Sequence, residues 1–291
     1  MINQTFRIGG IPEHFNFPWH IALEEGSFFD ANISIEWQDI PSGTGAMAQA
    51  LKENKLDIAI MLTEGAVRAI TDGLNIRIVQ NYVLSPLVWG IHAHPQHTGK
   101  EMDDFRGGQY AISRRGSGSH LMAHVDARNR DWNVEASQFN IVGDITGAIK
   151  SIHNSETDLY FGEKFTMKPY VDKRELTLID ICPSPWSCFV LVARNEVLIN
   201  QSKKIKTLQK IINQSCKNFM KEDFDTKSIA SRYELEEEDA LKWYDSTKWA
   251  TNNRINRSML NEVTDTLYDL KLIEHKLKPK EMCHEDFAHL S

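Results

Sequence analysis

Apolar and polar residues follow one another in the first part of the chain as short strands and amphipathic helices. Nearly continuous apolar runs predict buried strands, and apolar residues three or four positions apart predict helices. The expected strands lie at 6–9, 33–37, 57–62 and 76–83. The expected helices lie at 18–25, from 42 onward, and at 64–72. This alternation predicts a parallel sheet that is covered by helices on both faces.

The same rhythm restarts after about residue 87. Extended segments are expected at 87–93, 109–113, 139–142, 159–161, 176–181 and 189–193. Helices are expected from 120 to 129 and at 145–153, 164–172, 203–220, 227–233, 237–244 and 258–272. Because no Gly/Ser-rich or Pro-rich linker separates the parts, one lobe is predicted to be inserted into the other. The expected lobes are 1–91 with 195–291, and 92–194.

Composition and charge narrow the function classes. The chain has 291 residues and a formal net charge of −7, which disfavours a general nucleic-acid binder. No apolar stretch reaches the roughly 18 residues that a membrane span needs, so membrane insertion is not expected. The first residues show no basic patch followed by an apolar run. We therefore expect a cytoplasmic protein, and a periplasmic one only if an export signal was trimmed from this sequence.

Cysteine and histidine spacing predicts no metal site and no cofactor. The four cysteines, Cys182, Cys188, Cys216 and Cys283, contain no CxxC pair, and no Cys/His set has zinc-ligand spacing. Reduced thiols are the default, while a disulfide between Cys182 and Cys188 stays open. His92, His94 and His97 are expected on a strand or loop rather than on one helix face.

The segment 113–120 (SRRGSGSH) is the most informative candidate site. Its glycines allow close backbone approach, and hydroxyl and amide groups at a helix start favour an anion. The order of residues fits neither a P-loop nor a GxGxxG motif. The candidate ligand contacts here are Ser113, Arg114, Gly116, Ser117, Gly118 and Ser119. The alternative interpretation is a flexible turn with a helix cap.

Further candidates follow the ends of other expected strands. Segment 41–45 (PSGTG) is a second helix start rich in glycine and hydroxyl groups, for which capping is an adequate alternative. Glu13 and His14 follow the first strand, either as a ligand-binding pair or as a solvated turn. His14 is expected to titrate near neutral pH. The candidates in these two segments are Glu13, His14, Ser42, Gly43 and Thr44.

A weak internal repeat links two acidic turns. Segments 57–65 and 157–164 both have the form strand, turn, acid and helix. Thr63 and Glu64 in the first and Glu163 in the second are therefore candidate ligand contacts, although Glu64 is equally explained as a helix-dipole partner. Trp89 is a candidate for stacking on a flat ligand. Ligands of open α/β sheets bind at the carboxyl ends of strands, where these turns are expected.

Taken in order, the segments that start GGIPEHFNFPWH, PSGTGAMAQALKENKLDIAIMLTEGA, FRGGQYAISRRGSGSHLMA and TDLYFGEKFTMKPYVD resemble type II periplasmic binding proteins. They are most similar to the nitrate/sulfonate/taurine-binding and thiamine-pyrimidine-synthase-like branch, and especially to its signal-less relatives. The resemblance covers roughly residues 5–195. It implies a two-lobed α/β (Venus flytrap) fold, in which each lobe is a mostly parallel sheet flanked by helices. It also implies that the candidate loops clamp a ligand between the lobes.

The resemblance predicts a non-enzymatic binding protein for a small anionic or zwitterionic metabolite. Transporter subunits are expected as partners if the protein is exported. The alternative is an enzyme of thiamine-pyrimidine or related cofactor biosynthesis, although the clustered cysteine motif of the synthases is absent. An effector-sensing part of a regulator ranks last, because no DNA-binding segment is visible.

Overall fold

The computed structural model describes residues 5–291, and the chain forms two compact units. Unit 1 consists of Met1–Ser85 and Trp186–Ser291, and unit 2 is the continuous segment Pro86–Pro185. These boundaries fall before strand β5 (Val88–Ala93) and before strand β10 (Phe189–Arg194), a few residues earlier than the sequence analysis expected. The reason is strand pairing, because β5 pairs only within unit 2 and β10 only within unit 1.

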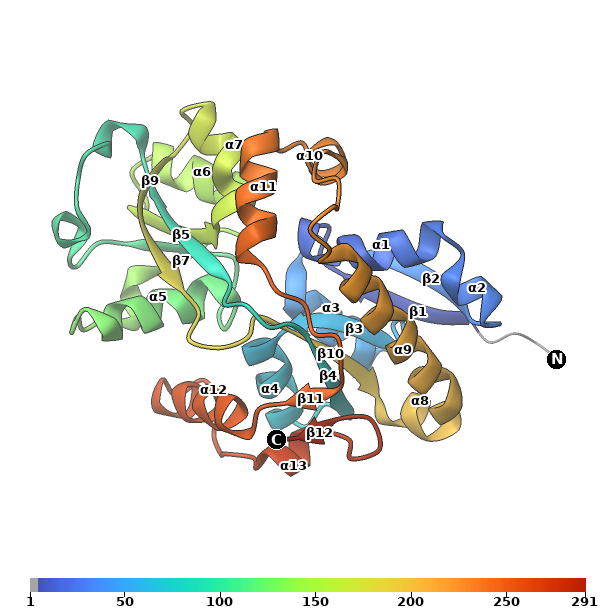
Figure 1. The fold of residues 1–291 in the computed structure, drawn as a ribbon. Coiled ribbons are helices and arrows are strands. Elements are labelled where there is room, and N and C mark those ends of the chain that lie inside the picture. The colour runs from blue at the N-terminus through green and yellow to red at the C-terminus, as the bar shows by residue number, and fades with distance from the viewer. Residues whose placement is uncertain (1–4) are drawn as a thin grey trace. The chain divides into compact units, whose positions relative to one another are not determined.

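Unit 1 is built on a five-stranded sheet with the order β2-β1-β3-β10-β4 (Figure 1). Its other strands are β1 (Thr5–Gly10), β2 (Ser34–Asp39), β3 (Ile58–Leu62) and β4 (Ile76–Val83). The pairs β1–β2 and β1–β3 are parallel, whereas β10 runs antiparallel to both of its neighbours. The carboxyl ends of β1, β2 and β3 therefore lie along one edge of the sheet.

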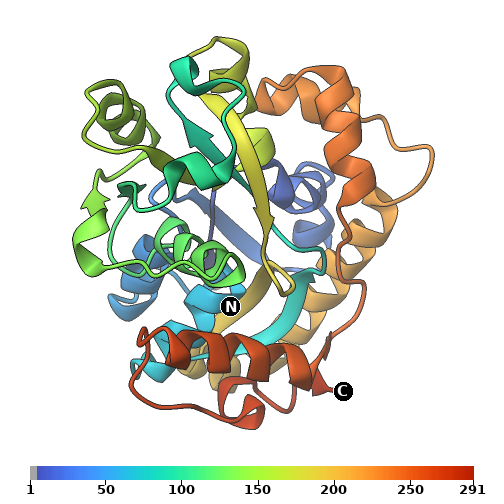
Figure 2. The ribbon, with the colours of Figure 1, turned by 90° about the vertical axis from the view of Figure 1, so that its left-hand side faces the viewer.

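Helices cover both faces of this sheet (Figures 1 and 2). Those in the first part of the chain are η1 (His14–Asn16), α1 (Phe17–Glu24), α2 (Ser27–Asp30), α3 (Gly43–Lys52) and α4 (Thr63–Thr71). Those that follow β10 are α8 (Asn195–Asn200), α9 (Ser202–Phe219), α10 (Lys227–Tyr233), α11 (Glu237–Ser246), α12 (Arg257–Asp269) and α13 (Pro279–Met282). Helix α1 packs on α9, and α4 packs on α3 and α12. Short strands β11 (Arg254–Ile255) and β12 (His289–Leu290) pair near the C-terminus.

Unit 2 repeats this architecture with the order β7-β6-β8-β5-β9. Its remaining strands are β6 (Tyr110–Ile112), β7 (Phe139–Ile141), β8 (Leu159–Glu163) and β9 (Thr177–Pro183). Its helices are η2 (Pro95–His97), η3 (Met102–Phe105), α5 (Gly118–Asn129), η4 (Ala136–Gln138), α6 (Ile145–His153) and α7 (Lys164–Asp172). The single antiparallel strand, β5, occupies the same fourth place that β10 holds in unit 1. Each sheet is thus mostly parallel, as predicted.

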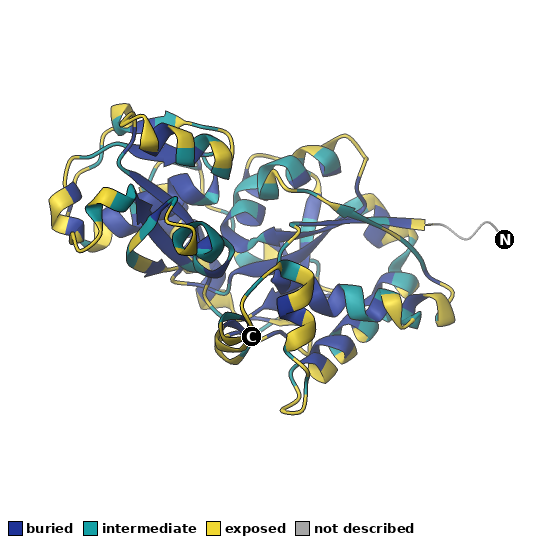
Figure 3. Ribbon diagram, turned by 90° about the horizontal axis from the view of Figure 1, so that it is seen from above, coloured by how far each residue is buried: buried dark blue, intermediate teal, exposed yellow. Residues whose placement is uncertain are grey.

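Apolar side chains fill the space between each sheet and its helices. In Figure 3 the strands of each unit are mostly buried, and the outward faces of the helices are exposed. Ala148, Ile152 and Met167 form part of the unit 2 core beneath α6 and α7. None of the helices within residues 5–291 has the length and apolar character that crossing a membrane would require. All four cysteines are buried free thiols, so the disulfide that the sequence left open is not formed.

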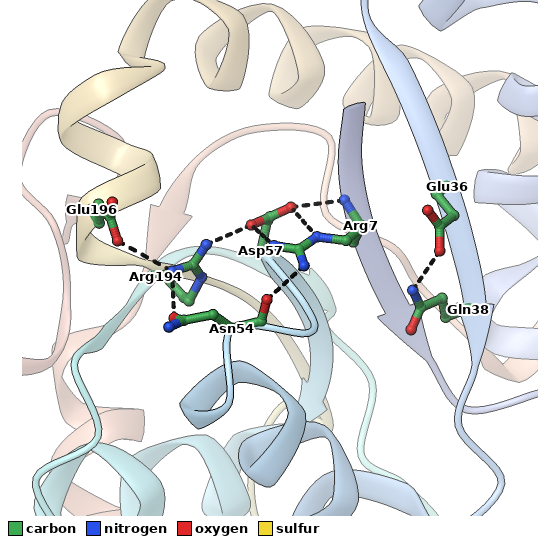
Figure 4. Close-up of polar contacts among 7 residues, drawn as sticks. All are labelled: Arg7, Glu36, Gln38, Asn54, Asp57, Arg194 and Glu196. Atoms are coloured by element: carbon green, nitrogen blue, oxygen red, sulfur yellow. Dashed lines mark hydrogen bonds and ion pairs between the residues drawn. The ribbon is translucent and has the colours of Figure 1, made fainter. Parts of the chain in front are cut away.

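A buried carboxylate ties three strands of unit 1 together (Figure 4). Asp57, just before β3, accepts hydrogen bonds from the backbone N–H and the guanidinium of Arg7 on β1 at 2.8–3.0 Å. Arg194 at the end of β10 donates to the same carboxylate at 2.7 Å. Burial favours a higher pKa for Asp57, but the hydrogen bonds from both arginines outweigh it and the pKa is lowered. The Asp57 side chain is only 4% exposed, whereas the side chains of Arg7 and Arg194 are 34% and 14% exposed, so a buried carboxylate is covered by two partly exposed guanidinium groups.

Candidate functional site

The unit 1 candidates gather along one edge of the sheet. Strands β1, β2 and β3 end there, and the segments that follow them carry Glu13 and His14, then Ser42 to Thr44, then Thr63 and Glu64. The parallel pairing of these strands places the starts of the three segments together. The structure therefore brings the predicted residues of the first half to a common edge, where open α/β sheets bind ligands.

Thr44 joins two of these segments. Its Oγ1 accepts a hydrogen bond from the Leu62 backbone N–H at 3.1 Å, which ties the start of α3 to the end of β3. Gly43, just before it, has a φ of 70°, a left-handed conformation that favours glycine. Gly65 in α4 packs so closely on Thr44 that a Cβ atom at this position would collide with Thr44 Cγ2.

Replacing Gly65 by alanine is expected to destabilise the protein by about 1–3 kcal/mol, because the methyl group has no room. In an unobstructed helix the same change would stabilise by about 1 kcal/mol, so the sign of the effect is diagnostic. The double variant Gly65→Ala/Thr44→Ser removes the colliding methyl but keeps the hydroxyl, and should recover the loss. Urea unfolding measures both. A stabilised single variant would show that α3 and α4 do not pack as described.

Glu64 is a buried carboxyl group with one identified side-chain donor. It is 5% exposed, and Trp186 Nε1 donates to its Oε2 at 2.9 Å. Burial raises the pKa of Glu64 to about 7, although the hydrogen bond from Trp186 acts in the opposite direction. The neighbouring Thr63 hydroxyl donates to the Ser187 carbonyl at 2.5 Å, which fixes this turn against the segment that leads into β10. Glu64 can thus change charge in the neutral pH range.

His14 differs from the sequence prediction in its environment. It is 2% exposed and packs on Phe15 and edge-on against Trp243 of α11, with ring centroids 4.9 and 4.2 Å away. Burial lowers its pKa to about 3, so the expectation that it titrates near neutral pH is wrong. The physical cause is the aromatic surround, part of which comes from a helix late in the chain. Glu13 beside it is half-buried.

In unit 2 the predicted loop closes on the start of α5. Ser119 Oγ accepts from the Ser113 backbone N–H at 3.2 Å and lies 3.0 Å from Ser117 Oγ. Ser117 is the N-cap of α5, and its Oγ accepts from the His120 N–H. Gly116 has a φ of 73°, which suits the tight turn between Arg114 and the cap. Gly118 begins the helix. The residues from 113 to 119 therefore form one hydrogen-bonded loop at the carboxyl end of β6.

Trp89 and Glu163 form a second part of the unit 2 edge. They are directly paired across β5 and β8, so their side chains lie on the same face. Glu163 is 6% exposed and its Oε2 accepts from the Thr166 N–H at 2.7 Å, while burial raises its pKa to about 7. Trp89 is 7% exposed, and its buried indole N–H has no hydrogen-bond partner among the residues that the structure describes. This N–H is a donor that a bound acceptor group would satisfy.

The two acids are not equivalent, although the sequence repeat paired them. Glu163 is the N-cap of α7, whereas the N-cap of α4 is Leu62 and Glu64 lies two positions further on. Both helices span nine residues and both follow the third strand of their sheet. The two segments therefore match as a strand followed by a helix, but their carboxyl groups occupy different positions at the helix start.

Sequence reasoning assigned no role to several residues at these edges. Trp186 is one of them, and its partner Glu64 is 122 positions away. His120 and His124 lie one turn apart on α5 with their Nε2 atoms 3.3 Å apart, a contact that the helical i, i+4 spacing would have signalled. Within residues 5–291, no set of three or more His, Cys, Asp or Glu side chains has an arrangement that could hold a metal ion.

Comparisons with known proteins agree with this architecture. Residues 89–181 match the family model described as Ca3427-like PBP. The whole chain resembles the solved structure of the Candida albicans CA3427 gene product, with 26% identity, a TM-score of 0.89, and coverage of 99% of this chain and 98% of that one. That protein is described as defining a new family with the generic periplasmic binding protein fold. Comparison with curated proteins gave no match.

Two more distant structures share the fold. One is the alkanesulfonate-binding protein SsuA from Xanthomonas axonopodis pv. citri bound to MOPS, with 13% identity, a TM-score of 0.76, and coverage of 99% of this chain and 98% of that one. The other is PhnD1 from Prochlorococcus marinus in complex with methylphosphonate, with 12% identity, a TM-score of 0.63, and coverage of 93% and 100%. The chain thus has the two-lobed α/β periplasmic-binding-protein fold that its sequence predicted.

Proposed function

We propose that this protein is a solute-binding protein for a small anionic or zwitterionic metabolite, with the carboxyl-edge loop of unit 2 as the anion-binding part of its site. The observation that carries the proposal is the loop from Ser113 to Ser119 in unit 2. It combines two buried hydroxyl groups, the amino end of a 12-residue helix and the neighbouring Arg114. Oxygen atoms of sulfonate, phosphonate or carboxylate groups suit such a set of donors.

The unit 1 edge supports the zwitterionic form of the ligand. Glu64 and Glu13 are acids, and His14 is neutral over the physiological range because its pKa lies near 3. A ligand amine or another hydrogen-bond donor is the natural complement of these carboxyl groups. The distant structural neighbours bound to MOPS and to methylphosphonate support an anionic group on the ligand.

A thermal-shift screen against alkanesulfonates, phosphonates, nitrate, phosphorylated pyrimidines and amino acids tests the proposal. A ligand at about 100 times its Kd should stabilise the fold by about 2.7 kcal/mol. Arg114→Ala is expected to weaken binding about 10- to 100-fold, the cost of one charge-assisted hydrogen bond. The matched control is Arg115→Ala, because the Arg115 guanidinium donates to the Ala136 carbonyl at 3.0 Å.

Mass spectrometry of the ligand after incubation separates binding from catalysis. Recovery of an unchanged ligand supports a binding protein, and consumption of the ligand supports the biosynthetic enzyme that the sequence left as the alternative. Equal losses of affinity in Arg114→Ala and Arg115→Ala would contradict the assigned site. A lack of stabilisation across the screen, together with native mass spectra free of co-purified ligand, would contradict the function.

A further inference from the structure

Two histidines stand behind the loop from Ser113 to Ser119. His120 and His124 lie on successive turns of α5, and their rings both pack on Phe139 of β7 with centroids 4.6 and 4.7 Å away. His120 is 5% exposed and His124 is half-buried. Their Nε2 atoms are 3.3 Å apart, so one ring must donate a proton to the other.

The direction of this hydrogen bond follows from the backbone. The Gly116 N–H donates to His120 Nδ1 at 2.9 Å, and a backbone N–H can only donate. His120 Nδ1 therefore carries no proton, and a neutral His120 carries its proton on Nε2. That proton points to His124 Nε2, which must accept, so His124 carries its own proton on Nδ1. The hydrogen bonds from Gly116 to His120 and from His120 to His124 therefore form a chain in which every donor is fixed.

This hydrogen-bond chain supports the turn of the loop at Gly116. Gly116 has a left-handed φ of 73°, and the acceptor of its N–H is His120 Nδ1. The hydroxyls of Ser117 and Ser119 form hydrogen bonds at the two ends of the loop. His120 accepts a hydrogen bond from its centre, at Gly116. The imidazoles thus lie one layer beneath the groups that we assign to the ligand.

We infer that His120 and His124 are positioning residues, which hold the loop in its ligand-binding conformation only while both rings are neutral. The inference rests on the proposed function, because only that proposal assigns ligand binding to this loop conformation. A proton added at His120 Nδ1 opposes the Gly116 N–H, and a proton added at His124 Nε2 opposes the His120 N–H. Either event breaks one bond of the chain and releases the turn.

The surroundings of His124 favour its neutral form. Burial first, and then the positive charge of Arg115 on the same loop, lower the pKa of His124. The apolar ring of Phe139 faces the pair from β7. The bond chain is therefore intact above the ordinary histidine pKa of about 6.5 and is lost as the pH falls below it, toward the lowered pKa of His124.

A transition metal is a poor alternative occupant, although the Nε2 separation suits two ligands of one ion. A metal on His120 Nε2 would leave the proton on Nδ1, where it would face the Gly116 N–H. A third protein ligand is also missing among the described residues. Zinc at equimolar concentration is accordingly expected to leave the ring nitrogen resonances unchanged.

The first test reads the ring tautomers without any ligand. Long-range ¹H–¹⁵N spectra at pH 7.5 should show His120 protonated on Nε2 and His124 protonated on Nδ1, the rarer form. The opposite assignment for His120, or displacement of either signal by equimolar zinc, overturns the inference.

The second test measures loop opening by hydrogen exchange of the Gly116 amide. Relative to its intrinsic rate, exchange should become about 10-fold faster from pH 7.5 to pH 5.5. His124→Gln keeps an acceptor that does not titrate, and should reduce this acceleration to the part that protonation of His120 causes. His120→Leu should open the loop at both pH values, and His120→Asn, which restores an acceptor for the Gly116 N–H, should close it again. The control is His153→Gln, since His153 contacts the Glu175 carbonyl instead.

The outcomes separate the two proposals. An acid-sensitive loop whose opening does not change the Kd for MOPS or methylphosphonate, the two probes, refutes the link to ligand binding. Failure of both probes to bind, with tautomers and exchange as expected, counts against the proposed function alone. A Gly116 amide whose relative exchange is independent of pH refutes the positioning role.

Discussion

Replacing Asp57 by alanine is expected to lower the free energy of unfolding by about 3–5 kcal/mol, because it leaves two guanidinium groups without their common carboxylate. Arg7 and Arg194 both lie against Asp57, and the Arg194 side chain is 14% exposed. Asn54 accepts one hydrogen bond from each arginine at 2.6 Å but carries no charge to replace the carboxylate. Urea unfolding at pH 7 measures the loss.

The matched control is Asp72→Ala at the C-cap of α4. Asp72 pairs with Arg68 at 3.6 Å, and its side chain is 57% exposed. A surface pair of this kind contributes about 0.5 kcal/mol. Similar losses in the two variants would mean that the Asp57 triad is solvated in solution. Because the pKa of Asp57 is lowered, its contribution should also fade in acid, as the pH drops below the ordinary value of about 3.9.

Glu64→Gln is expected to make the protein more stable at alkaline pH, an unusual result for a substitution in a candidate site. The pKa of Glu64 is about 7 in the folded protein, above its ordinary value. The folded state thus favours the protonated carboxyl, and this stabilisation is present below about pH 4.5 and lost as the pH rises through 7. Relative to wild type, the variant should gain about 3 kcal/mol between pH 4.5 and pH 8.

The glutamine side chain keeps an acceptor for the Trp186 N–H, so the comparison isolates the charge. Glu262→Gln on α12 is the control, because Glu262 is exposed and its removal changes the net charge equally. Unfolding free energies at several pH values should diverge for Glu64→Gln alone. If the unfolding free energies of the two variants change with pH in the same way, ionisation of Glu64 costs little free energy in the folded state. Its carboxyl group is then more exposed to water than described.

Local patterns predicted most of the elements and the place of the candidate loops. The expected helix at 18–25 is α1, the expected strand at 57–62 is β3, and the expected helix at 145–153 is α6. Apolar periodicity and capping residues predict these elements, and both signals lie within a short segment of the sequence. The same windows give no strand direction, and so the antiparallel course of β5 and β10 was not foreseen.

The environment of individual side chains depends on distant partners. Asp57 and Arg194 are 137 positions apart, and Glu64 and Trp186 are 122 positions apart. His14 is buried by Trp243, a residue of α11. No local rule connects such pairs, so the sequence marked Glu64 and His14 as candidate ligand contacts but did not indicate the raised pKa of the one or the lowered pKa of the other.

Unit 1 consists of two segments separated by unit 2, so its sheet must be completed in two stages during synthesis on the ribosome. Strand β4 has seven of its eight residues buried in the finished fold, and within residues 5–291 its only neighbour in the sheet is β10. The intervening residues form unit 2, whose five strands pair among themselves and need nothing from either flank. At about 5–20 residues per second, the roughly 100 intervening residues take on the order of 5–20 s to appear. Throughout that delay β4 lacks its partner strand, so the sheet of unit 1 cannot be completed before β10 has been synthesised.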